Sequence, residues 1–71
     1  MEVVVKTKFN AQKQRIEKVL GNKYIMYLAF SEDAGTISTI IAMLSKHFGV
    51  PTSNIQFKGF TATKDRLFEL L

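Results

Sequence analysis

The chain has no cysteine, only one histidine and only one proline among its 71 residues. Without cysteine it has no disulfide, no thiolate nucleophile and no cysteine metal site. Absence of cysteine is typical of proteins in a reducing compartment, so we expect a cytoplasmic location. With His47 as the only imidazole, a metal site would need carboxylates alone. We expect no metal and no cofactor.

Paired catalytic groups are also scarce. None of the serines has an evident base, so a Ser-His-Asp arrangement is unsupported. Glu32 and Asp33 form the only acidic pair, and adjacent residues are too close in sequence to indicate a two-carboxylate mechanism. The sequence therefore predicts that the protein is not an enzyme.

Long hydrophobic runs are missing as well. The longest, Tyr24–Phe30, is far shorter than the roughly 20 residues that cross a bilayer. No basic segment precedes a long apolar run at the amino terminus, as a secretory signal would require. We expect no membrane contact and one domain over residues 1–71, because so short a chain can build only one core.

Positive charge is concentrated in the first part of the chain. Residues 1–28 hold six lysines and arginines against two glutamates, which leaves +4, whereas the four cations and four acids of residues 29–71 cancel. The cations of the first part are Lys6, Lys8, Lys13, Arg15, Lys18 and Lys23. Together with Lys58 they could form a basic surface for nucleic acid, where phosphate contacts supply the affinity. The plainer interpretation is a solvated face that blunts strand pairing.

Two segments have the pattern of strands. In Val3–Phe9 apolar residues alternate with Lys6 and Lys8, which predicts a strand with both lysines on one wet face. Tyr24–Phe30 is apolar at both parities, which is typical of an interior strand covered on both faces. We place it near the middle of the sheet.

The clearest element is a helix near residues 34–48. Its apolar positions recur at helical spacing and form one stripe. Asp33 can cap or complement the helix start, Gly49 supplies a left-handed stop, and Pro51 prevents continuation. The stripe consists of Ile37, Ile40, Ile41, Leu44 and Phe48.

Two other segments fit both kinds of structure. Asn10–Leu20 has the cap and spacing of a short helix, but Arg15–Leu20 could also be a strand that turns through Gly21 into a hairpin. Local propensity slightly favours the helix. The tail, residues 63–71, suits either a helix or a strand at Phe68–Leu70, whereas Ile55–Lys58 alternates as a strand does.

Several blocks resemble the signature of the YggU-like family of small bacterial and archaeal proteins. Gly49–Ile55 fits the family turn Gly-Val-Pro-x-Ser-x-Val, and Thr63–Arg66 falls on its basic motif if one extra residue precedes it. Most polar signature residues of the helix-start block are changed, since Ala34 stands for the family glycine and Ile37 for its asparagine. The other matching blocks are Lys8–Gln12, Ala29–Ile37 and Leu44–Lys46.

The resemblance implies a two-layer α+β fold, with a mixed sheet of about four strands and one main helix packed on one face. It favours the hairpin for residues 15–30 and a strand for Phe68–Leu70, against local propensity. If Asn10–Leu20 and the tail are helices instead, the chain alternates strand and helix three times.

The resemblance also implies a polar site at the helix start. There Gly35 and Thr36 would supply donors and Lys64 and Arg66 would supply cations for an anion such as phosphate. The plainer interpretation is an ordinary capped helix beside a solvated basic tail. A hydrolase or transferase built on Asp33, Thr36, Lys64 and Arg66 ranks last.

We therefore expect a non-catalytic binding module for a phosphate-rich partner such as RNA or DNA. The candidate residues are Lys6, Lys8, Lys13, Arg15, Gly35, Thr36, Lys64 and Arg66. Exposed aromatic residues among Phe9, Tyr24, Tyr27 and Phe60 would stack on bases. The alternative is a protein-interaction or assembly domain, including a homodimer, that docks through a sheet edge or an apolar patch.

Overall fold

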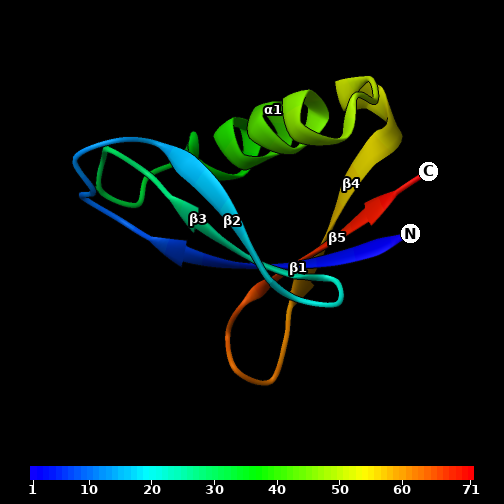
Figure 1. Cartoon of the computed structure of the whole chain (residues 1–71), viewed down its shortest axis with the longest axis horizontal. Coiled ribbons are helices and arrows are strands. Elements are labelled where there is room, and N and C mark those ends of the chain that lie inside the picture. The colour runs from blue at the N-terminus through cyan, green and yellow to red at the C-terminus, as the bar shows by residue number, and fades with distance from the viewer.

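The chain folds into a mixed five-stranded sheet with one α-helix packed across one face (Figure 1). A computed structural model describes all residues, 1–71. The predicted two-layer α+β fold is confirmed, with five strands rather than about four. The elements are β1 (Glu2–Lys8), β2 (Arg15–Leu20), β3 (Lys23–Tyr27), α1 (Thr36–Phe48), the short 3-10 helix η1 (Thr52–Asn54), β4 (Ile55–Phe60) and β5 (Arg66–Leu70).

The first strand lies at the centre of the sheet, between two hairpins. The strand order is β2-β3-β1-β5-β4, with β1 parallel to β3 and antiparallel to β5. The hairpins are β2 with β3 and β4 with β5, so β2 and β4 are the open edges. Gly21 turns the first hairpin at φ 58°, a left-handed conformation that glycine adopts at little cost.

Both ambiguous segments are strands, so the helical interpretations of Asn10–Leu20 and of the tail are wrong. Ile16 lies opposite Met26 and packs against the core, and this tertiary contact stabilises the extended conformation of β2. Phe68 and Leu70 are buried because β5 runs between β1 and β4. Long-range pairing thus overrides the weak local preference for helix.

The helix begins two residues later than the predicted start and ends as predicted. Ile40 and Leu44 are fully buried, and the other stripe residues pack against the core as half-buried side chains. Gly49 at φ 69° ends α1, and its N–H donates to the carbonyl of Ser45 at 2.9 Å. The apolar stripe therefore faces the sheet, as its spacing indicates.

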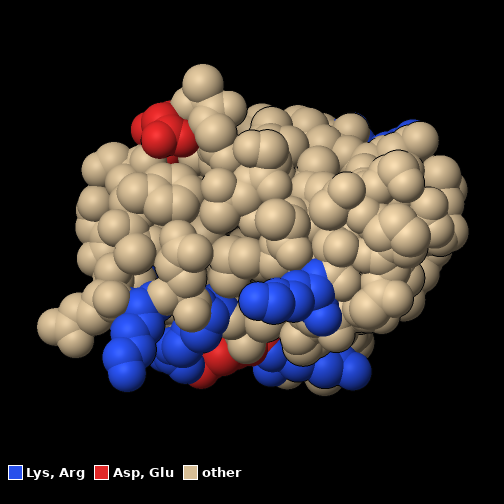
Figure 2. Space-filling model, turned by 90° about the horizontal axis from the view of Figure 1, so that it is seen from above, with Lys and Arg blue, Asp and Glu red and all other residues tan.

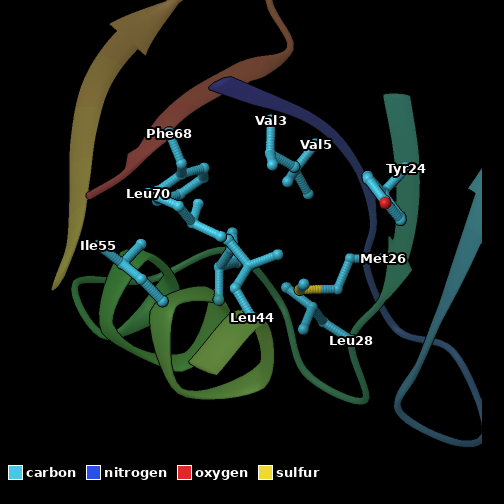
Figure 3. Packing of buried hydrophobic residues seen from close by; sticks show 10 residues of the cluster. Val3, Val5, Tyr24, Met26, Leu28, Leu44, Ile55, Phe68 and Leu70 are labelled. Atoms are coloured by element: carbon cyan, nitrogen blue, oxygen red, sulfur yellow. The ribbon is translucent and has the colours of Figure 1, made fainter. Parts of the chain in front are cut away.

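A compact hydrophobic core fills the space between α1 and the sheet (Figure 3). Side chains of β1, β3, β4 and β5 converge on the helix in this view. The Tyr24 ring meets the Phe48 ring edge-on, with centroids 5.5 Å apart, and so joins β3 to the end of α1. The core consists of Val3, Val5, Tyr24, Met26, Leu28, Ile40, Leu44, Ile55, Phe68 and Leu70.

Of the strand expected at Tyr24–Phe30, only residues 24–27 belong to β3, which is interior but is covered on one face only. Tyr24 and Met26 are buried under the helix, whereas Ile25 and Tyr27 are half-buried on the opposite face. The helix lies on one side of the sheet, and no other element covers the second side (Figure 1). Apolar character at both parities therefore leaves hydrophobic side chains on an open face.

Candidate anion-binding surfaces

Strand alternation and register place a set of cations on the side of the sheet opposite α1, called here the uncovered face. Tyr24 and Met26 face the helix, so their neighbours in β3 face away from it. The residues of the uncovered face include Val4, Lys6, Lys8, Arg15, Glu17, Lys23, Ile25, Tyr27 and Leu67.

These side chains form rows across the strands. Lys8 lies beside Tyr27, which lies beside Arg15. In the next row Lys6 lies beside Ile25. Neighbours in register on one face are close enough for their side chains to touch. The uncovered face is therefore a platform in which lysines alternate with apolar side chains.

A second feature of this face is that one of its cations is already compensated. Arg15 forms an ion pair with Glu17, and its guanidinium carbon lies 4.1 Å from the centroid of the Tyr27 ring. The Tyr27 hydroxyl donates to Glu17 Oε1 at 3.1 Å. By contrast, Lys6 and Lys8 form no ion pair, and neither does Lys23. The lysines are thus the cations that remain available to a ligand.

The predicted residue Lys13 extends this surface beyond the first residue of β2, in the loop that precedes the strand. It lines a shallow hollow together with Ala11, Gln12, Arg15 and Tyr27. The structure therefore brings together four of the predicted residues, Lys6, Lys8, Lys13 and Arg15, at one end of the sheet. Lys23, which lies beside Val4 in the row after Lys6, completes the surface.

Cations also line a hollow at the edge of the sheet, where β2 lies closest to α1. Arg15, Lys46 and His47 line this hollow with Ile16 and Met43. Figure 2, viewed from the helix side, shows most of the visible lysine and arginine side chains along the lower edge and a further blue patch at the upper right, while most of the remaining surface in view carries no charge. Most of the positive charge in this view therefore lies along one edge.

The expected site at the helix start is not formed as predicted. The Gly35 amide donates to Asp33 Oδ1 at 2.8 Å, and the buried Thr36 hydroxyl accepts from the Asp33 amide at 3.0 Å. The Thr36 amide also donates to the Asp33 carbonyl, at 3.2 Å. Because the Asp33 loop already accepts from both backbone amides, Gly35 and Thr36 offer no amide donor for an anion there, and the Thr36 side chain is buried.

Lys64 and Arg66 do come together, in a different setting from the one expected. They line a hollow with Thr7, Glu32 and Phe60, called here the Arg66 hollow. Arg66 is only 6% exposed, and one of its terminal nitrogens donates to the Thr7 hydroxyl at 2.9 Å. The other terminal nitrogen is paired with Glu32. The guanidinium is therefore a buried charge held by a hydroxyl and one carboxylate.

Thr7 and Glu32 are contributors that sequence reasoning did not select, and Lys23 was counted in the basic surface but left out of the final candidate residues. Strand alternation could have pointed to Thr7, which lies on the opposite side of β1 from Lys6 and Lys8. Lys23 belongs to the basic first part of the chain. No local signal joins Glu32 to Arg66, because the two residues are distant in sequence and meet only after the sheet has formed.

No group of three histidine, aspartate or glutamate side chains is placed to share a metal ion. No helix has both the length and the apolar character that crossing a bilayer requires. No protein-family model matches the chain, and no solved structure matches it significantly. The chemistry of the two surfaces is therefore the basis for the function proposed below.

Proposed function

We propose that the protein is a non-catalytic module that binds single-stranded RNA or DNA on the uncovered face. The observation that carries this proposal is the set of three unpaired lysines, Lys6, Lys8 and Lys23, around half-buried apolar side chains. Ammonium groups contact phosphates, and open sheet faces with flat apolar or aromatic side chains accept unstacked bases.

The geometry favours a single strand over a duplex. Lys6 and Lys8 are alternate residues of β1, so they lie about 6.6 Å apart along one line. Ile25 and Tyr27 lie beside them in register and offer apolar contact. No helix lies on this face to enter the major groove of a duplex (Figure 1). With a single aromatic ring, the face would bind with little sequence preference.

A divergent kinship with the YggU-like family remains part of the proposal. The strands at residues 15–20 and 66–70 support it, because the resemblance implied strands there against local propensity. The helix-start residues differ from the family pattern, and Gly35 and Thr36 are hydrogen-bonded to Asp33. Both observations favour a different binding surface in this chain. The fold would be shared while the ligand contacts differ.

Fluorescence anisotropy with short labelled RNA and DNA strands tests the proposal, at about 50 mM and about 200 mM salt. The double variant Lys6→Gln, Lys8→Gln should bind about tenfold more weakly or worse. The slope of the logarithm of its affinity against the logarithm of the salt concentration should also be smaller in magnitude by about one to two, which is about one for each lost phosphate contact. Thermal unfolding of each variant checks that the fold is retained.

The matched control is the double variant Lys18→Gln, Lys46→Gln. It removes the same net charge, but Lys18 lies opposite Tyr24 and so faces the helix side, and Lys46 is on α1. We expect its affinity to stay within about threefold of the parent protein, because only long-range attraction is lost. Equal losses in both variants, or no binding even at low salt, would contradict the proposal.

A second candidate function is assembly through the β2 edge. Val19 and Leu20 are 55% and 78% exposed near the end of this open edge strand. Exposed apolar side chains beside unpaired backbone groups suit pairing with another strand. Light scattering on concentrated protein distinguishes the candidates. A mass above one chain that returns to one chain in Leu20→Lys would favour assembly, and a single-chain mass throughout would exclude self-association.

A further inference from the structure

The Arg66 hollow contains a charge that its surroundings compensate only loosely. Arg66 is buried, and transfer of an unpaired cation out of water is costly. Its single anionic partner is Glu32, whose side chain is 61% exposed and lies in the irregular segment before α1. An exposed carboxylate is readily solvated, so little free energy holds it on Arg66. The ion pair can therefore open at low cost to Glu32, provided that another anion replaces it.

Donor groups remain unused around this guanidinium. Arginine carries five N–H groups, and Thr7 and Glu32 account for two contacts. The Arg66 Nε has no hydrogen-bond partner and is the one buried side-chain nitrogen or oxygen of which this is true. Buried polar groups in proteins are rarely left in this state unless a ligand or another role accounts for them.

The walls of the hollow add a second cation and hold the first in place. Lys64 lines the hollow, forms no ion pair, and stands at φ 65° in the turn between β4 and β5. The Arg66 guanidinium carbon lies 5.1 Å from the Phe60 centroid and 5.8 Å from the Phe9 centroid. Two aromatic rings therefore flank the guanidinium and restrict its orientation.

We propose that the Arg66 hollow binds a phosphate monoester and that Glu32 occupies the same position as an internal substitute. A phosphate group carries close to two negative charges and three acceptor oxygens, so it suits a guanidinium and an ammonium together better than one carboxylate does. Arg66 donates N–H groups to the phosphate oxygens in place of Glu32, Lys64 adds the second charge, and the Thr7 hydroxyl retains a proton to donate. The site is independent of the uncovered face, which uses other residues.

Arginine side-chain NMR gives a direct readout, because the chain has only two arginines, Arg15 and Arg66. Titration with inorganic phosphate should shift the Nε–H signal of Arg66 and leave that of Arg15 in place. Glu32→Gln should bind phosphate about tenfold more tightly, since the competing carboxylate is gone. Lys64→Gln should bind about fivefold more weakly, whereas Lys46→Gln, which removes a charge elsewhere, should change affinity less than twofold.

Two further ligands distinguish the source of the phosphate. Uridine monophosphate presents it on a nucleotide and phosphoserine presents it on an amino acid, and tighter binding of one identifies the class. The proposal is overturned if Glu32→Gln binds phosphate no more tightly than the parent and Lys64→Gln behaves like Lys46→Gln. In that case the ion pair of Glu32 and Arg66 is purely structural. Should Glu32→Gln fail to fold, the comparison of Lys64→Gln with Lys46→Gln in the parent background decides alone.

Discussion

At the scale of single residues, a neighbouring carboxylate determines whether a surface cation is available. Arg15 lies on the uncovered face, but Glu17 pairs with it and also accepts from the Tyr27 hydroxyl. The three side chains hold one another, with the guanidinium over the ring. We therefore expect Arg15 to contribute less to the proposed phosphate binding than its charge suggests, while Glu17 places a negative charge among the lysines.

Glu17→Gln tests this arrangement. The amide can still accept from Tyr27, but the negative charge is removed, so RNA should bind about three to five times more tightly and with a steeper salt dependence. Glu2→Gln is the matched control, because it removes the same charge from the row furthest from Arg15 on that face. Anisotropy titrations measure both. If the two variants strengthen binding equally, net charge rather than the Arg15 row is responsible.

At the scale of elements, the end of α1 depends on one backbone conformation. Gly49 adopts φ 69°, and the amides of Gly49 and Val50 both donate to the Ser45 carbonyl, at 2.9 and 3.2 Å. A side chain in this left-handed region is strained whatever space surrounds it. The turn leads directly into η1 and β4, so its geometry also determines the direction of the hairpin formed by β4 and β5.

Gly49→Ala should therefore lower the free energy of unfolding by about 1 kcal/mol or more. Gly35→Ala is the matched control at the other end of the helix. Gly35 has φ −90°, and an added Cβ would lie 3.4 Å from Asp33 Oδ1, an ordinary contact. We expect Gly35→Ala to change stability by less than about 0.5 kcal/mol. Urea denaturation of both variants provides the comparison, and similar losses would argue against a left-handed requirement at Gly49.

Elements with a strong local pattern could be predicted, and elements that depend on distant partners could not. The stripe of α1 and the alternation of β1 are visible in short windows of sequence. Ile16, Val19 and Leu20 in β2 have helical spacing, and only pairing with β3 decides for a strand. For β5 the deciding neighbours are β1 and β4. In both cases the resemblance to the YggU-like family favoured a strand where local propensity did not.

At the scale of the whole molecule, the sequence indicated which cations are candidates for binding but not which of them lie together. Charge counting found Lys6, Lys8, Lys13 and Arg15, and register then gathered them on one face. The family resemblance pointed to Lys64 and Arg66, yet Thr7 and Glu32, which line the same hollow, come from other parts of the chain. Sequence spacing contains no information about such contacts, because they exist only once β1, β5 and the segment before α1 are in place.

The central position of β1 has a consequence for how the molecule assembles. Val3 pairs with Phe68, so the middle of the sheet joins residues from nearly opposite ends of the chain. Closing a loop of this length costs conformational entropy before any contact repays it. The two hairpins can form early because their contacts are local, whereas the pairing of β1 with β5 forms later. The folding rate should therefore be limited by the pairing of β1 with β5, which also places Val5 opposite Arg66.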